Sequence, residues 1–560
     1  MNKRKIKISL LDKTIALISP KAAQERIMNK VAFNNSMGVL SDQGFITNTS
    51  NRRSMRGWSA TANNSNADII PKSESMRASS RDLNMNSPIA HAAIERFSTN
   101  SLGLGLKCKP QIEREFLGFN GSEGNEAAKK WEINTQREWE AFSESIYSDA
   151  ELTYNINENA VLVFTNMLLS GDVFVALPAI KIHGQTYNTK IKVIEADYCT
   201  NPMGLMETYK IAGGVEVNRL GAPIAYHLIK QNATDILSIN GLHRQKWERI
   251  ERFNKMGLQQ ILHLFRKTRP GQRKGVGVLA PIIETIKQRT RYEKAEIDAA
   301  ILNAMFTVFI KSVNNSTGKQ LETGYVPPSL DSGIDESVNV SEKIVTKAQD
   351  SDDKNYQIGN ANILELDENQ DISMADPKHP IIGYEKFADA TAKEIGAALG
   401  ISHEVLMMEF GKSFSASKAA LQEAWKSFML YRKFMINHYF EPIYETFMYE
   451  AIAKGRIEAP GFIDDAIIRK AWLRADWVGA GQGMIDPLKE TNAAVKRIEN
   501  RITTREREYQ QIVGGDWYVG MNNFSKEIDH LESLDISTNS DKLTKHTLEQ
   551  KNLQKDNNNV

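Results

Sequence analysis

The sequence predicts an α+β protein, and three changes of pattern along the chain carry that prediction. Short runs rich in Val, Ile and Tyr, separated by Gly, Asn and Pro, occupy residues 171–230 and are typical of antiparallel strands. A segment without internal Gly or Pro, residues 282–310, favours one long helix. Helix-favouring sequence resumes at Tyr384 and dominates to about Glu508. A chain of 560 residues is too long for a single hydrophobic core, so several domains are expected.

The N-terminal part is basic and polar. Residues 1–60 contain eleven Lys and Arg against three Asp and Glu. Within them, Pro20 to Val31 favours a short amphipathic helix. Asn, Ser and Arg dominate Thr47 to Ser80, a composition that indicates a surface arm or a partly disordered lead-in. We therefore expect residues 1–87 to form a basic arm with a lead-in helix.

Two helices are expected before the strands. Pro88 suits the first turn of a helix, where its missing N–H is harmless, and Gly103 and Gly105 would end that helix before a strand. Trp131 and Trp139 then lie on one long helical stretch. The strand-rich segments that follow are GDVFVALPAI at 171–180, KIKVIEADYCT at 190–200, YKIAGGVEVNRLG at 209–221 and PIAYHLIK at 223–230.

The segment after the long helix is less regular. Residues 311–359 are polar and mildly acidic, which suggests either a mobile loop or a small insertion. Two short strands are predicted next, at 361–366 and 371–374. The last forty residues, which end in KDNNNV, are expected to be frayed.

Composition excludes several classes of protein. An apolar fraction of 41%, a charged fraction of 25% and a net charge of +1 are ordinary for a globular chain and give no global electrostatic partner. Cys108 and Cys199 cannot form a disulfide framework or a cysteine-based zinc site, so a reducing compartment or a disulfide-free particle fits best. The N-terminal apolar run is interrupted by Asp12 and Lys13, which argues against a secretory signal. No run reaches eighteen apolar residues, so no membrane span is expected.

The sequence contains no complete catalytic motif. Gly411–Ser413 reads GKS, but a phosphate loop needs a glycine at position 406, which is Leu406. A flexible loop between two helices is the better interpretation. His403–Glu404 lacks the second histidine of a metalloprotease helix, because position 407 is methionine. We therefore expect no enzyme activity, no metal and no cofactor.

Positive charge is concentrated between Leu264 and Lys294, a segment that contains nine basic residues and two acidic ones. A basic turn at 266–274 could be a solvated loop at the edge of a sheet, but the helix after it continues the charge and a polyanion partner becomes a hypothesis. The candidate residues are Arg266, Lys267, Arg269, Arg273 and Lys274 in the turn, and Lys287, Arg289, Arg291 and Lys294 on the helix.

Several stretches, in this order, resemble the lambda-like family of phage portal proteins. They cover nearly the whole chain. The RPGQ-R-G turn and the loop SFSAS, when they occur together and in this order, are specific for the resemblance. The matching stretches are RASSRDLNMNSPIA at 77–90, SGDVF at 170–174, IEAD at 194–197, GVEVNRLGAPIAYHLIK at 214–230, HLFRKTRPGQRKGVGVLAP at 263–281, IGAALGISHEVLMMEFGKSFSASKAALQEAW at 395–425 and WVGAGQGMIDPLKETNAAVKRIENRITT at 477–504. One departure is LDENQD at 366–371, where the family more often has a Pro-Gly-Glu turn.

The resemblance implies a portal-type fold with a strand-rich wing, a helical stem, a small α/β clip, a tunnel loop and a helical C-terminal crown. The implied boundaries are 88–280 for the wing, 281–310 for the first stem helix, 311–382 for the clip, 383–403 for the second stem helix, 404–415 for the tunnel loop, 416–488 for the channel helix and its return to the wing, 489–530 for the crown and 531–560 for a frayed tail.

The function that the resemblance implies is a ring of about twelve subunits at one capsid vertex, the conduit for DNA packaging and ejection. Implied partners are non-specifically bound double-stranded DNA, the terminase large subunit, a major capsid or scaffold protein and head-completion proteins. The implied location is the virion, after assembly in the host cytoplasm. The tunnel-loop candidates for DNA contact are Met407, Met408, Lys412, Ser413 and Ser415.

Two other functions stay open on the sequence alone. A DNA-packaging enzyme, such as a terminase-like ATPase or nuclease, would need a metal cluster or an intact phosphate loop. A minor capsid assembly protein without DNA contact would need neither. The stem charges are also ambiguous, because Arg291 and Glu293 could pair between neighbouring subunits instead of facing DNA.

Overall fold

The computed structural model describes residues 61–230, 246–304, 308–312, 370–374, 384–410, 413–482, 486–514 and 517–533, with a few helical positions between 21 and 29. The chain divides into two compact units, Met1–Asp68 and Ile69–Val560. Most of the expected helix at Pro20–Val31, the expected strand at 361–366 and the tail after Ser533 lie outside the described residues.

The polar stretch that was expected to be an arm is in large part a helix. Helix α3 (Ser65–Asn86) leads directly to α4 (Pro88–Ser101), with Ser87 between them. Arg77 on α3 is buried and donates to the carboxylate of Asp197 at 2.8 Å, and Arg81 reaches the same carboxylate at 2.5 Å. The expectation of a surface arm is thus wrong for residues 65–80. The polar side chains form ion pairs within the fold, a use that composition does not reveal.

Aromatic side chains fill the main core, where four helices meet. The helices are α5 (Gly121–Ser143), α6 (Ile156–Ser170), α10 (Phe414–Met435) and α11 (Glu441–Ala453). Trp139 of α5 packs edge to face on Tyr444 and Phe447 of α11, with ring centroids 5.2 Å apart in both pairs. Edge-to-face packing adds to the stability that aromatic burial supplies. The predicted helix with both tryptophans is confirmed.

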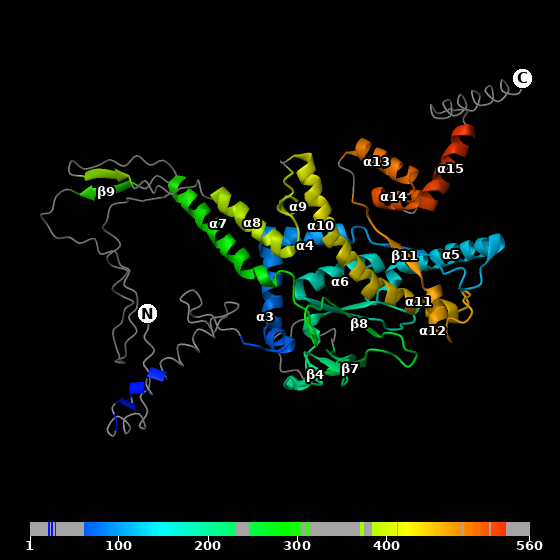
Figure 1. Ribbon diagram of the computed structural model, residues 1–560, viewed down its shortest axis with the longest axis horizontal. Coiled ribbons are helices and arrows are strands. Elements are labelled where there is room, and N and C mark those ends of the chain that lie inside the picture. The colour runs from blue at the N-terminus through cyan, green and yellow to red at the C-terminus, as the bar shows by residue number, and fades with distance from the viewer. Residues whose placement is uncertain are drawn as a thin grey trace, which may run out of the picture. The chain divides into compact units, whose positions relative to one another are not determined.

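The strands between residues 171 and 265 form two antiparallel sheets, which confirms the antiparallel strands predicted within 171–230 and adds β7. The first has the order β3-β2-β8, and α6 packs on β2 (Figure 1). The second has the order β4-β5-β6-β7 and shares a small core with β2 through Phe174 and Tyr226. The strands are β2 (Asp172–Ala176), β3 (Lys192–Glu195), β4 (Ile211–Ala212), β5 (Val215–Val217), β6 (Pro223–Ile229), β7 (Trp247–Glu251) and β8 (Ile261–Phe265).

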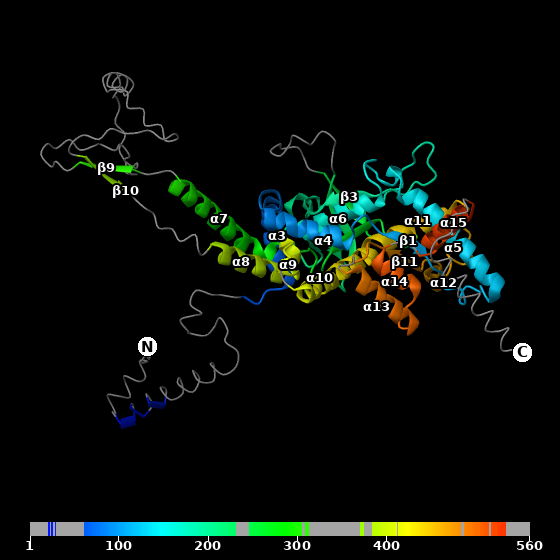
Figure 2. The same cartoon turned by 90° about the horizontal axis from the view of Figure 1, so that it is seen from above.

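Helix α7 (Ile283–Ala304) and helix α8 (Tyr384–Leu399) lie side by side in both views of the chain (Figures 1 and 2). The long helix was predicted to reach Ile310, but Val308–Ser312 is strand β9, paired antiparallel with β10 (Gln370–Met374). β-branched and aromatic residues (Thr307, Val308, Phe309, Ile310) favour a strand there and end the helical tendency. The predicted strand at 371–374 is confirmed.

The C-terminal part is mostly helical, as expected. A short helix α9 (His403–Met407) precedes α10, and a π-helical turn, Ile436–Phe440, joins α10 to α11 without a break. Strand β11 in this part was not predicted, and it pairs with β1 (Lys107–Pro110), the strand expected after Gly105. The remaining elements are α12 (Ala466–Trp472), β11 (Ala475–Val478), α13 (Pro487–Glu499), α14 (Arg505–Ile512) and α15 (Trp517–Ser533).

Candidate functional site

The helix pair α7–α8 holds the four basic candidates of the long helix, and Arg289 joins the two helices. Its side chain is buried. Arg289 Nε donates to Glu293 at 2.7 Å, and Nη1 donates to the carbonyl oxygen of Ala388 on α8 at 2.9 Å. A guanidinium with its donors committed in this way positions helices and is not presented to a ligand. Arg289 therefore has a structural contact within one chain, and so does Glu293.

The other three cations of α7 lie on its exposed side. Lys287 pairs with Asp82 of α3 at 2.6 Å, where both side chains are about half exposed. Arg291 and Lys294 are exposed, and neither makes an ion pair among the residues that the structure describes. Exposed cations without local partners are the ones that a polyanion or another subunit can use. Of the four, Arg291 and Lys294 fit that use best.

The basic turn is held together by one buried amide, Gln272. Its Oε1 accepts hydrogen bonds from the backbone N–H of Thr268 at 2.8 Å and of Arg269 at 3.1 Å. Its amide nitrogen donates to the carbonyl oxygen of Lys274 at 2.8 Å. Arg266, Lys267 and Arg269 are left on the outside of a rigid turn.

Lys274 lies inside the protein, although the sequence placed it with the surface cations. Only 3% of its side chain is exposed, and its ammonium pairs with the buried Asp172 at 3.2 Å. His263 lies 3.2 Å from the same carboxylate oxygen and stacks on Phe174. A paired, buried lysine of this kind is not available to a phosphate. Arg273 also turns inward in part, because it donates to the carbonyl oxygen of Thr208 at 3.4 Å.

Burial and pairing compete at this buried cluster. Burial alone would raise the pKa of Asp172, but Lys274 and His263 hold that pKa below its ordinary value. Burial lowers the pKa of His263 in spite of the hydrogen bond to Asp172, so its imidazole is neutral at pH 7. Asp172 Oδ1 has no hydrogen-bond partner in the described part of the chain. The cluster ties β2, β8 and the basic turn together.

The turn between α9 and α10 contains the tunnel-loop candidates. Residues 403–407 are helical, and Met408 adopts a left-handed conformation with φ 58° that ends α9. Met407, Met408 and Phe410 are exposed, whereas Val405 and Leu406 face the core. The expectation that the whole of 404–415 is a loop is therefore wrong at its two ends, where α9 and α10 begin or continue.

Two serines begin the next helix. Ser413 caps α10 by accepting a hydrogen bond from Ala416 N–H, and Ser415 is exposed in the first turn. Lys412 and Gly411 lie outside the described residues. The turn thus presents three large apolar side chains next to the position of Lys412.

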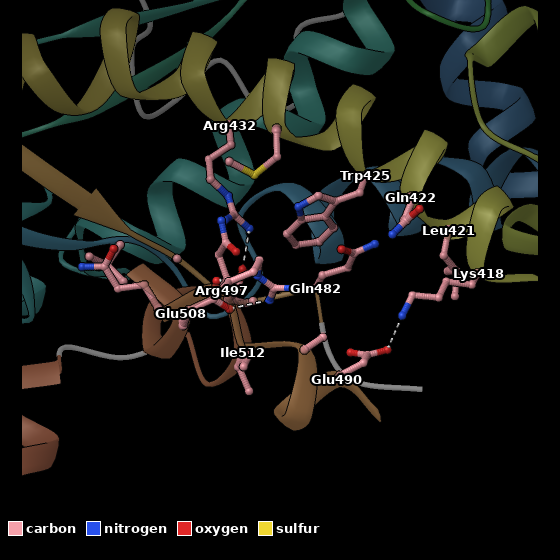
Figure 3. A pocket seen from close by; sticks show the side chains of 18 of the residues that line it. Lys418, Leu421, Gln422, Trp425, Arg432, Gln482, Glu490, Arg497, Glu508 and Ile512 are labelled. Atoms are coloured by element: carbon pink, nitrogen blue, oxygen red, sulfur yellow. Dashed lines mark hydrogen bonds and ion pairs between the residues drawn. The ribbon is translucent and has the colours of Figure 1, made fainter. Parts of the chain in front are cut away.

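A cavity of about 580 Å³ lies between α10 and the segment that runs from β11 to α14 (Figure 3). Trp425 and Leu421 form its apolar wall. Lys418 pairs with Glu490 at 2.9 Å across its edge, and Arg497 pairs with Glu508 at 2.7 Å on its floor. The Arg497 guanidinium holds the pKa of Glu508 below its usual range. No sequence motif indicated this cavity, because its walls come from four separate segments.

The described residues hold no group of three or more His, Cys, Asp or Glu side chains that could bind a metal ion. Among them, no helix combines the length and the apolar character needed to cross a bilayer. The buried carboxylate of Asp172 is paired with the ammonium of Lys274.

The family model of the phage portal protein, lambda family, matches residues 51–432, more than half of the chain. The chain belongs to this family of phage portal proteins. Portal protein B of Escherichia phage lambda is 23% identical over an alignment of 476 residues that covers 81% of this chain and 83% of that protein. The portal protein of Escherichia phage N15 is also 23% identical, over 464 residues, with 81% and 84% covered.

Solved structures of gene transfer agent (GTA) particles are also similar. The neck of an empty particle gives a TM-score of 0.36 at 12% identity and covers 62% of this chain and 75% of that chain. The virion of the native particle gives a TM-score of 0.38 at 10% identity, with 78% and 92% covered. Both TM-scores are low, so the assignment rests on the sequence matches.

Proposed function

We propose that copies of this chain form a closed ring at one capsid vertex, and that DNA is packaged and ejected through its central channel. Family membership over residues 51–432 supports the portal role. The wing, stem, clip, tunnel-loop and crown assignments are part of the proposal, with α7 (Ile283–Ala304) as the first stem helix and with the tunnel loop confined to the turn between α9 and α10. A ring of about twelve subunits is also part of the proposal.

The observation that carries a ring is the turn between α9 and α10. Met407, Met408 and Phe410 are exposed together in a single chain. Large apolar side chains that gather on a surface mark a place that another molecule covers. In a ring, the neighbouring subunit would cover them. Lys412, which follows them in the sequence and lies outside the described residues, is proposed to face the channel.

Arg291 and Lys294 of α7 provide the second line of support. They are exposed cations on a helix whose other side is fixed to α8 by Arg289. A channel must attract phosphates weakly and without base recognition, because tight contacts would hold the DNA in place. A few cations per subunit, repeated around a ring, meet that requirement.

The partners of the ring are proposed from the family: the terminase large subunit, which would supply ATP hydrolysis, a major capsid or scaffold protein, and head-completion proteins. The subunit itself is proposed to be structural and not an enzyme. Assembly would take place in the host cytoplasm and the finished ring would remain in the virion.

The test is the mass and shape of the purified protein. Light scattering after size-exclusion chromatography should give about twelve times the subunit mass of 63.0 kDa, and particle images along the symmetry axis should show a central hole. A protein that stays monomeric at micromolar concentration, and is absent as a ring from capsids, would contradict the proposal.

A further inference from the structure

Two loops of the second unit expose several large apolar side chains each. The first, residues 202–210, is here named the methionine loop. Its Met203, Leu205, Met206 and Tyr209 are between 60% and 88% exposed. Isolated apolar side chains are normal on a surface, but four within seven residues form a patch that indicates a partner.

Hydrogen bonds fix the backbone of the methionine loop. The amide of Asn201 donates to the carbonyl oxygen of Leu205 at 2.9 Å, and Thr208 N–H donates to Ile211 at 2.8 Å. Arg273, from the basic turn, donates to the carbonyl oxygen of Thr208 at 3.4 Å. A loop that is already ordered loses little conformational entropy when it binds.

The second loop, residues 144–154, is here named the tyrosine turn. Ile146, Tyr147, Leu152 and Tyr154 are exposed on it. The buried carboxylate of Asp149 accepts hydrogen bonds from three backbone N–H groups, those of Glu151 at 3.1 Å, Thr153 at 3.0 Å and Tyr154 at 3.2 Å. This loop is therefore also fixed while its apolar side chains face outward.

The two loops have opposite electrostatic surroundings. No Lys, Arg or His occurs between Arg137 and Lys181, and Glu144 and Glu151 are exposed on the tyrosine turn. The methionine loop carries the exposed Lys210 together with the exposed Glu207, whose carboxylate accepts a hydrogen bond from Gly213 N–H at 2.8 Å. Arg273 of the basic turn interacts with Glu207 and offsets its charge, which leaves Lys210 and the exposed Lys267 of the basic turn as the excess positive charge. Opposite charges around matched apolar centres favour docking of one on the other.

The loops belong to different parts of the unit. The methionine loop leads into β4 of the four-stranded sheet. The tyrosine turn joins α5 to α6 and bridges, through Asp149, to Ile191 beside the three-stranded sheet. One chain can therefore offer each loop to a different neighbour, as a head-to-tail contact requires.

We propose that the tyrosine turn of one subunit docks on the methionine loop of the next, with Glu144 and Glu151 facing Lys210 and Lys267. The occupant is a second copy of this chain, because both complementary surfaces are present in the same sequence. This inference rests on the proposed ring and names a contact that closes it. The basic turn then serves subunit assembly through Lys267 and Arg273.

Cross-linking between copies tests the contact. One population carries Tyr147→Cys and a second carries Met206→Cys, and the two are assembled together and treated with a short bifunctional maleimide. The native Cys108 and Cys199 are buried and do not react. A covalent dimer on a denaturing gel is expected, whereas Met256→Cys, an exposed methionine outside both loops, should give none when it replaces Met206→Cys.

Charge reversal gives an independent readout. Glu144→Lys together with Glu151→Lys should raise the subunit concentration needed for half-assembly about tenfold. Adding Lys210→Glu and Lys267→Glu to that variant should restore the original concentration. Glu126→Lys, an exposed acid on α5, is the matched control and should have no effect.

The results separate the two proposals. If rings form normally, give no cross-linked dimer and assemble at an unchanged subunit concentration in both charge-reversal variants, the proposed contact is wrong and the proposed ring stands. Wild-type protein that never forms a ring and gives no covalent dimer would overturn both.

Discussion

The guanidinium of Arg432 on α10 lies at the carboxyl end of α4, where its Nε donates to the carbonyl oxygen of Ser101 at 2.7 Å. Its Nη2 also donates to Asn100 at 3.2 Å and to Ala480 at 3.0 Å. Arg432 thus satisfies the unpaired carbonyl groups that end α4 and offsets the negative end of the helix dipole. The same side chain stacks on Trp425 in the wall of the cavity (Figure 3).

Replacing Arg432 with methionine should destabilise the protein by roughly 2–4 kcal/mol, because three carbonyl oxygens would lose their donor in a buried place. The free energy of unfolding in denaturant measures this loss. Lys426→Met on the same helix, where the side chain is exposed, is the control and should change stability by less than about 0.5 kcal/mol. Equal effects of the two variants would contradict the role of Arg432.

Stability should fall as the pH falls below about 6.5, because the unfolded chain binds a proton at His263 that the folded chain does not. The pKa of buried His263 is lowered, so its contribution is complete above the ordinary value of 6.5 and is lost toward lower pH. Asp172, whose pKa is also lowered, adds a second loss only when the pH falls below 3.8.

The measurement is the free energy of unfolding between pH 7 and pH 5. His263→Phe keeps the ring stacked on Phe174 and should reduce the slope by up to about 1.4 kcal/mol per pH unit. His183→Phe, which alters an exposed histidine, should leave the slope as it is. An unchanged slope in His263→Phe would show that this histidine does not titrate on unfolding.

Gly275→Ala should strongly destabilise the protein. A Cβ at position 275 would lie 1.8 Å from the carbonyl oxygen of Gly171, an impossible distance for rigid backbone. The two backbone segments cannot separate without disturbing the adjacent Asp172–Lys274 pair, so we expect a loss at the upper end of the 1–3 kcal/mol typical of overpacking, or beyond it. Gly118→Ala, at an open position with positive φ, should cost only about 1 kcal/mol. Thermal melting of both variants compares them.

Lys412→Glu should impair DNA passage or retention and leave ring assembly intact, because a repeated negative charge in the channel repels phosphates. The amount of genome per particle is the measurement, and the defect should shrink as salt concentration rises. Lys130→Glu, an exposed lysine on α5 in the proposed wing, is the control. Particles of Lys412→Glu that package and hold a full genome would remove Lys412 from the channel.

Purified protein should not hydrolyse ATP or cleave DNA, because Leu406 occupies the position where a phosphate loop requires glycine. A phosphate-release assay and a plasmid-nicking assay measure the two activities. Hydrolysis that disappears in Lys412→Ala would restore the packaging-enzyme interpretation.

Most helices and the sheet strands between residues 171 and 230 were predictable, because periodic apolar residues and turn residues are local signals. Strand β11 was not, since its four residues become a strand only by pairing with β1, more than 360 positions earlier. Lys274 shows the same limit for the site. Its position in a run of five cations indicated the surface, and its partner Asp172 lies about a hundred residues away in the sequence.

The polar sequence of α3 misled the prediction for a related reason. Arg77 and Arg81 reduce the apolar character that identifies a packed helix, yet both meet Asp197 from a distant turn. Long-range ion pairs of this kind have no local pattern. A turn between two helices was predictable from the small residues at 411–413, which are a local pattern, whereas Met407 and Met408 became candidates only through the resemblance to the portal family.

From Phe414 to Ala453 the backbone is helical without interruption, with the π-helical turn at Ile436–Phe440 inside it. Forty residues at 1.5 Å each make a rod about 60 Å long. It begins just after the turn between α9 and α10, and its last turns are embedded in the aromatic core around Phe447. We therefore expect a displacement of the N-terminal end of this rod to be carried into the aromatic core, and the π-helical turn at Ile436–Phe440, where the regular hydrogen-bond pattern is interrupted, to be the place where the rod bends first.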